Sequence, residues 1–163
     1  MRLKFYLIVL MLVTIDLITK YYIDNMIAIY DPIIINNFVI LNKVYNKGLV
    51  FGFAHSESVF INYSLTFLMT CLLLYLIYYV NKILTENERV SKITFVAWSL
   101  VLGGGLANYI DRLIDNKVVD FILVRYENYY FPGIFNVADI FISLALVIFI
   151  FIMFFEDEKE SKL

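Results

Sequence analysis

Long apolar stretches divide the chain into four segments that approach the roughly 20 residues a helix needs to cross a bilayer. They run over about residues 5–27, 59–80, 93–112 and 134–155. Apolar residues make up 62% of the chain and the mean hydropathy is +0.80, both above the usual range of soluble domains. The pattern predicts one mainly α membrane domain over residues 1–163, with four transmembrane helices.

Two longer segments, about residues 28–58 and 115–133, separate these spans on one side. In the first, Ile33-Ile34-Ile35 and Phe38-Val39-Ile40-Leu41 are β-prone runs bounded by asparagine-rich turns. Asn46-Lys47-Gly48 is a further turn signal. We therefore expect a small β-rich segment that lies on the membrane surface.

Basic residues favour one orientation, because Lys and Arg accumulate on the cytoplasmic side of membrane proteins. The opposite side carries fewer of them, including Lys117, which we expect to be solvated in its loop. This bias predicts cytoplasmic termini, with the two longer segments on the outer side of the membrane. The residues on the predicted cytoplasmic side are Arg2, Lys4, Lys82, Arg89, Lys92, Lys159 and Lys162.

Charge and cysteine usage exclude several other classes of function. The formal net charge of −2 argues against a broad nucleic-acid surface. The single Cys71 permits neither an intrachain disulfide nor a cysteine-based zinc site, and no cofactor or metal is expected. The single His55 is expected to be a loop residue near the membrane surface.

Two acidic residues occupy positions where a membrane protein rarely keeps a charge. Asp120 lies within Val118-Val119-Asp120-Phe121-Ile122, and Asp139 opens the last apolar run. A carboxylate next to hydrocarbon is costly unless it is paired or used, so both are functional candidates. If the two meet, their repulsion lets the pair hold one proton and act as acid and base on one water.

Further polar residues recur at helical spacing beside these carboxylates. Asp16 and Lys20 share one face of the first span, either as a neutralising pair or as a pair that orients other groups. Asn108, Asp111 and Arg112 share a face of the third span. They either hold a peptide backbone or close the helix with an Asp–Arg salt bridge.

Asn136 and Asp139 also have the spacing of a helix N-terminus, where the amide caps and the acid suits the helix dipole. No serine-nucleophile, metal or phosphate-loop motif competes with these residues. Carboxylates are the acid–base groups that remain at the predicted outer face.

At these residues the chain resembles the bacterial lipoprotein signal peptidases, also called signal peptidase II, over nearly its whole length. Each matching motif is short, but their order and depth are specific. They are Asp16-Leu17-Ile18-Thr19-Lys20, Asn46-Lys47-Gly48-Leu49-Val50-Phe51-Gly52, Asn108-Tyr109-Ile110-Asp111-Arg112, Val118-Val119-Asp120-Phe121-Ile122 and Phe135-Asn136-Val137-Ala138-Asp139.

The resemblance implies an intramembrane aspartic endopeptidase without a cofactor, with Asp120 and Asp139 as the catalytic pair. It implies cleavage of prolipoproteins amino-terminal to a diacylglyceryl-modified Cys, contact with membrane lipids, and inhibition by the cyclic peptide globomycin. The implied substrate-binding residues are Asn46, Gly48, Asn108, Arg112 and Asn136, and the supporting residues are Asp16, Lys20 and Asp111.

Three positions depart from the family pattern and bear on the shape of the pocket. Tyr45 stands where an Arg is common, Val50 replaces a small residue, and Ala107 replaces a Gly. One alternative is a small proton-coupled transporter, which would use the same carboxylates as a relay and needs a polar path through the bilayer. Another is a membrane-anchored scaffold, which leaves the clustered polar motifs unexplained. Clustering of the polar motifs at one face favours the peptidase.

Overall fold

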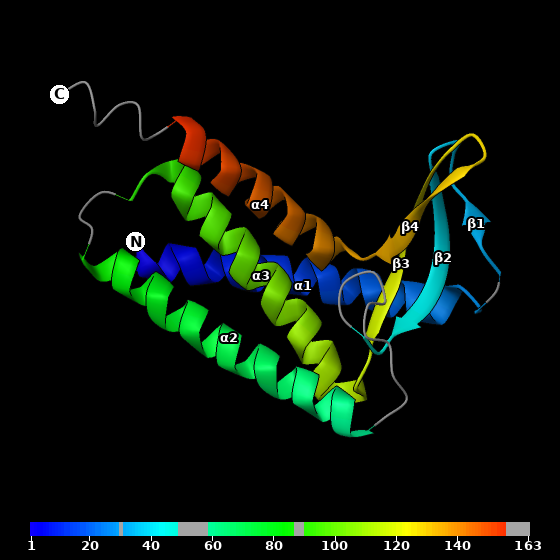
Figure 1. Cartoon of the computed structure of the whole chain (residues 1–163), viewed down its shortest axis with the longest axis horizontal. Helices are drawn as coiled ribbons and strands as arrows, with labels where there is room; N and C mark the ends of the chain where they lie inside the picture. Colours follow the sequence, from blue (N-terminus) through cyan, green and yellow to red (C-terminus); the bar gives the residue numbers. More distant parts are fainter. Residues whose placement is uncertain (30, 49–58, 87–89, 156–163) are drawn as a thin grey trace.

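The described part of the chain folds into four helices with a sheet at one end. In the computed structural model this part comprises residues 1–29, 31–48, 59–86 and 90–155. Figure 1 shows the helices side by side, with the start of α1 and the ends of α2 and α4 away from the sheet. The predicted fold class, a mainly α membrane protein with a small β-rich segment, is confirmed. The helices are α1 (Arg2–Met26), α2 (Val59–Glu86), α3 (Lys92–Asp115) and α4 (Val137–Phe155).

Three helices of the described chain are long and apolar enough to cross a membrane. These are Phe60–Glu86, Lys92–Asp115 and Val137–Phe154, which correspond to three of the four predicted spans. The helix α1 is of similar length but is not among them, and it carries Asp16 and Lys20. Both side chains are buried within the protein, so these charges face protein partners and not lipid.

The predicted boundaries need two main corrections. The second span, expected over 59–80, continues as α2 to Glu86. The fourth, expected over 134–155, begins as a helix only at Val137, because Ile134 and Phe135 end a strand. Apolar character alone cannot separate a buried strand from the helix that follows it.

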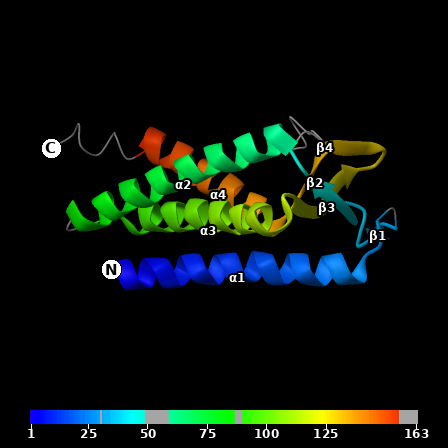
Figure 2. The ribbon, with the colours of Figure 1, turned by 90° about the horizontal axis from the view of Figure 1, so that it is seen from below.

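The helix α3 occupies the centre of the bundle and packs against α1, α2 and α4. Figure 2 shows α1 on one side of α3, with α2 and α4 on the other. Two glycines let its neighbours approach closely. A Cβ built on Gly103 would lie 2.7 Å from Leu12 Cβ on α1, and one on Gly104 would lie 2.6 Å from the Ala138 carbonyl oxygen on α4.

The sheet is antiparallel and has the strand order β1-β2-β3-β4. The predicted strand runs fall on β1 and on a β2 that continues past Leu41 to Asn46. No strands were predicted in the second outer segment, where the structure has β3 and β4. Pro132 lies in β4, an edge strand, which tolerates proline. The strands are β1 (Ile33–Ile34), β2 (Val39–Asn46), β3 (Val118–Tyr126) and β4 (Tyr129–Phe135).

The end of α3 leads directly into the sheet. Asn116 adopts a left-handed conformation with φ of 54°, and its N–H donates to the Arg112 carbonyl at 3.0 Å. Asparagine tolerates this conformation better than most residues. After two intervening residues, the chain enters β3, which carries Asp120.

Some sequence-based expectations fall outside the described residues. These are the interpretation of His55 and the role of Val50.

We expect Gly104→Ala to destabilise the fold more than Gly105→Ala. A methyl group at Gly104 meets backbone, whereas one at Gly105 lies 3.2 Å from Leu73 Cδ2, the end of a flexible side chain. Alanine favours a helix by about 1 kcal/mol over glycine, while overpacking costs about 1–3 kcal/mol. Thermal unfolding midpoints in detergent should fall for the first variant and change little for the second. Equal midpoints would remove the close approach of α4 as the reason for Gly104.

Candidate active site

Asp139 is held at the first turn of α4 by reciprocal hydrogen bonds with Asn136. The Asp139 N–H donates to Asn136 Oδ1 at 2.9 Å, and the Asn136 N–H donates to Asp139 Oδ2 at 3.2 Å. This is a capping box, which satisfies two backbone donors of the helix start. The capping interpretation of these residues is therefore correct, and the cap also fixes the direction of the Asp139 carboxylate.

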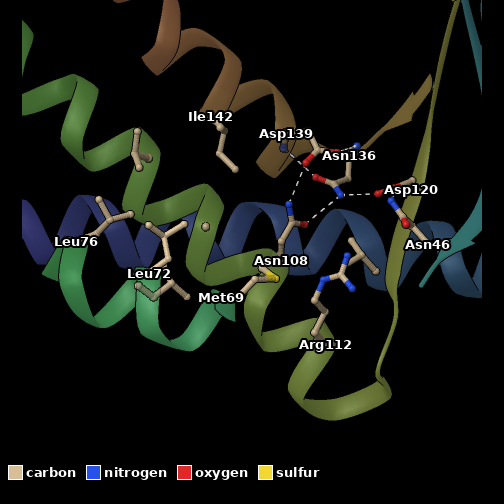
Figure 3. A pocket seen from close by; sticks show the side chains of 14 residues that line it. Asn46, Met69, Leu72, Leu76, Asn108, Arg112, Asp120, Asn136, Asp139 and Ile142 are labelled. Carbon is tan, nitrogen blue, oxygen red and sulfur yellow. Dashed lines mark hydrogen bonds between the residues drawn. The ribbon is translucent and has the colours of Figure 1, made fainter. Parts of the chain in front are cut away.

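The Asp120 side chain points from β3 toward Asn136 and Asp139 (Figure 3). Its Oδ1 accepts a hydrogen bond from Asn136 Nδ2 at 2.6 Å, and its Oδ2 accepts one from Asn46 Nδ2 at 2.9 Å. Register explains the second contact: Asn46 pairs with Val118, so it is the diagonal neighbour of Asp120 on the same sheet face. Asp120 is 2% exposed and Asn136 is fully buried.

Asn108 connects this pair to α3. Its Nδ2 donates to Asp139 Oδ1 at 2.9 Å, and its Oδ1 accepts from Asn136 Nδ2 at 3.1 Å and from Lys20 Nζ at 2.7 Å. Because an ammonium group only donates, the contact with Lys20 fixes which end of the Asn108 amide faces Asp139.

Lys20 lies between two further carboxylates. Its Nζ is 2.6 Å from Asp16 Oδ2 and 2.8 Å from Asp111 Oδ2. Asp16 Oδ1 also accepts the Ala138 N–H at 2.7 Å, at the start of α4. Both interpretations of the Asp16–Lys20 pair therefore hold, because the pair neutralises itself and also ties α1 to α3 and α4.

Arg112 joins α3 to the turn after β2. It is 5% exposed, and it donates from a terminal guanidinium nitrogen to the Gly48 carbonyl. The Gly48 N–H in turn donates to Asn46 Oδ1 at 2.9 Å. Within the described chain no ion pair joins Arg112 to Asp111, so the predicted helix-closing salt bridge is wrong; Asp111 pairs with Lys20 instead.

All ten residues that the sequence singled out thus lie in one network at the sheet end of the bundle. A pocket of about 270 Å³ opens beside them. Its polar end is lined by Asn46, Asn108, Arg112, Asp120, Asn136 and Asp139. The apolar wall comes mostly from α2 and was not predicted, because an evenly apolar helix gives no signal for the face it turns to a pocket. The labelled members of that wall in Figure 3 are Met69, Leu72, Leu76 and Ile142.

Burial governs the electrostatics of the pair. Burial of its carboxyl group, together with the nearby Asp139 carboxylate, raises the pKa of Asp120 from 3.8 to about 7. The hydrogen bonds from Asn46 and Asn136 oppose this rise, because they stabilise the charged form. The arrangement can therefore hold a proton on one carboxyl group near neutral pH while offering the other as a base.

Two further sequence-based expectations concern the surroundings of Lys117 and the binding of metal. Lys117 lies in the connection before β3, as expected, but it is only partly exposed, and its Nζ lies 3.5 Å from the centroid of the Tyr45 ring. Among the described residues, no group of three His, Cys, Asp or Glu side chains is placed to hold a metal ion.

The comparisons with known proteins agree on one family. The family described as signal peptidase (SPase) II matches residues 8–155. A lipoprotein signal peptidase of Listeria welshimeri is 30% identical over 95% of this chain and 96% of its own length. One from Clostridium tetani is 31% identical, and the alignment covers 96% of each protein.

Two solved structures, each described as a bacterial membrane enzyme, have the same fold. One is 26% identical, with a TM-score of 0.74 over 98% of this chain and 92% of its own. The other is 25% identical, with a TM-score of 0.75 over 92% of each chain. With a family match over residues 8–155 and relatives of equal length, the chain belongs to the signal peptidase II family of membrane peptidases.

Proposed function

We propose that the chain is an aspartic endopeptidase that removes the signal peptide from diacylglyceryl-modified prolipoproteins, with Asp120 and Asp139 as the catalytic pair. The observation that carries this proposal is the pair of carboxylates, Asp120 buried and Asp139 half-buried, each held by an asparagine amide at the polar end of one pocket. The names of the relatives, lipoprotein signal peptidases, support the substrate class.

Each carboxyl group of the pair carries out one of the two proton transfers in peptide hydrolysis. Asp139 receives N–H donors from Asn108 and from the backbone at the start of α4, and both favour its ionised form. It takes a proton from water while the water oxygen forms a bond to the substrate carbonyl carbon. Asp120 carries the other proton and gives it to the leaving nitrogen as the C–N bond breaks.

The two halves of the pocket suit the two parts of the proposed substrate. An extended peptide would lie at the polar end. There Arg112 Nε is buried, has no hydrogen-bond partner among the described residues, and can donate to a substrate carbonyl. The apolar wall from α2, with Leu72 and Leu76, would lie against apolar groups of the signal peptide or the acyl chains. The scissile bond is then the one amino-terminal to the lipid-bearing Cys.

Location follows from the same proposal. We place both termini in the cytoplasm and the sheet outside the bacterial inner membrane, because the sequence segments assigned to the cytoplasmic side carry more Lys and Arg than the two outer segments. A translocated precursor would then meet the pair at the outer face.

The polar side chains gather at this one end, which favours a peptidase over a proton-coupled transporter, as does the family. Globomycin, which the family resemblance names as an inhibitor, should compete with the precursor for this pocket.

Asp120→Asn and Asp139→Asn should each abolish cleavage of a diacylated precursor while the protein remains folded and inserted. An amide keeps the size of the side chain but can neither take a proton from water nor give one to the leaving amine. Purified variants are compared with the unchanged chain in micelles, with unfolding midpoints as the control for folding and excess chelator as the control for metal. Near-normal turnover by either variant would remove the pair from the proposal.

Cleavage should slow as the pH rises above about 7. The Asp120 carboxyl group, whose pKa is raised to about 7, then loses the proton that the leaving amine needs. The rate should approach a tenfold loss per pH unit on this side, and it should also fall in acid once both carboxyl groups are protonated. Initial rates across the pH range measure this. A rate that keeps rising to pH 9 would contradict Asp120 as the acid.

Arg112→Ala should reduce the cleavage rate by about a hundredfold or more, because loss of a buried, hydrogen-bonded charge typically costs a few kcal/mol. Arg112→Lys should recover only part of this loss, since an ammonium cannot both reach Gly48 and donate in the plane of a guanidinium. Lys92→Ala serves as the matched control, because Lys92 is an exposed cation at the other end of α3. Equal, small effects of Arg112→Ala and Lys92→Ala would take Arg112 out of the site.

A further inference from the structure

A second polar cluster lies on the opposite face of β2 from the pocket. Tyr45 Oη donates to Asp24 Oδ1 on α1 at 2.7 Å. Lys43, which is buried, donates to the Asp24 carbonyl oxygen at 2.8 Å and lies 3.2 Å from Asp24 Oδ1. Lys117, between α3 and β3, covers the Tyr45 ring with its Nζ 3.5 Å from the ring centroid. The Tyr45 side chain is therefore held by Asp24 on α1 and by Lys117, which lies in the connection between α3 and β3.

This cluster lies directly behind the contact between Asn46 and Asp120. Successive side chains of a strand point to opposite faces, so the direction of Asn46 follows from the seating of Tyr45. Lys117 immediately precedes Val118, which is the register partner of Asn46. Because Tyr45 is on β2 and contacts the residue just before β3, its side chain fixes the end of β2 against the start of β3, at the point where the Asn46 amide reaches Asp120 at 2.9 Å.

We propose that Tyr45 is a positioning residue that, through its contacts with Asp24 and Lys117, holds the Asn46 amide on the Asp120 carboxylate. Tyr45 stands where an Arg is common in the family. In this chain the position therefore carries an aromatic ring, and the cation beside it is Lys117, from the α3–β3 connection. The inference rests on the proposed function for its consequence in catalysis. The geometric claim, that Tyr45 controls the environment of Asp120, can be tested without turnover.

The titration of Asp120 reports on this contact. The Asn46 amide stabilises the ionised form of Asp120, so loss of the contact raises the pH at which Asp120 loses its proton. The other charged groups that face Asp120 are Asp139 on α4, Arg112 on α3 and Lys20 on α1. Substitution at Tyr45 leaves these three in place, so a shift in the titration follows the Asn46 contact.

The experiment follows the carboxyl carbon of Asp120 by NMR in micelles of the full chain labelled with carbon-13 at aspartate, with Asp120→Asn to assign the signal. Asn46→Ala should raise the titration midpoint by about one pH unit. Tyr45→Ala should raise it by about half a unit or more, and Tyr45→Phe, which keeps the ring under Lys117, should raise it less. In the double variant Tyr45→Ala/Asn46→Ala the midpoint should equal that of Asn46→Ala alone, because the effect passes through Asn46.

Tyr129→Ala is the matched control, because Tyr129 is an exposed tyrosine of the same sheet. It should leave the midpoint unchanged. An unchanged midpoint in Tyr45→Ala and Tyr45→Phe, or additive shifts in the double variant, would overturn the positioning role even if precursor cleavage is normal. If precursor is not cleaved by the unchanged chain but the midpoints shift as described, the proposed function fails and the positioning role stands.

In an active enzyme, Tyr45→Ala should also move the alkaline limb of kcat upward in pH with little change in KM, which a general loss of stability would not do.

Discussion

The placement of two like charges in one pocket, Asp120 buried and Asp139 half-buried, is the constraint on which the rest of the structure depends. A carboxylate removed from water is costly, and a second one nearby increases the cost. Asn136 relieves both at once, since its side-chain amide donates to Asp120 and its backbone N–H donates to Asp139. The same residue caps α4. One residue, Asn136, therefore serves both the start of α4 and the geometry of the carboxylate pair.

The remaining elements hold the partners of this residue in place. Close packing at Gly103 and Gly104 brings α1 and α4 against α3, so that Asn108 reaches Asp139 and Lys20 reaches Asn108. Antiparallel pairing of β2 with β3 brings the Asn46 amide to Asp120 from the other direction. Helix and sheet therefore each position one carboxylate, and the pair forms only where the two meet.

Much of this arrangement was predictable, since the polar residues of the site stand out against apolar surroundings. Asp120 has apolar neighbours in sequence, and Asn136 and Asp139 have the spacing of a cap. The partner of Asp111 was not predictable, because Lys20 and Arg112 offer similar charges and only the packing of α1 on α3 decides between them. The end of strand β4 was not predicted, because Ile134 and Phe135 continue into the apolar run of the fourth span. The apolar wall on α2 was not predicted, because that helix is evenly apolar. The role of Lys117 depends on a cross-strand contact with Tyr45 that no local spacing indicates.

The central claim is that the two aspartates direct water to one peptide bond, and product analysis in oxygen-18 water tests it most directly. The purified chain is mixed with a diacylglyceryl-modified precursor, and both products are weighed by mass spectrometry. We expect a mature fragment that begins at the lipid-bearing Cys with a free amine, and a signal peptide with a single oxygen-18 atom in its new carboxyl group. No cleavage, a cut at another bond, or a signal peptide without the heavy oxygen would contradict the account.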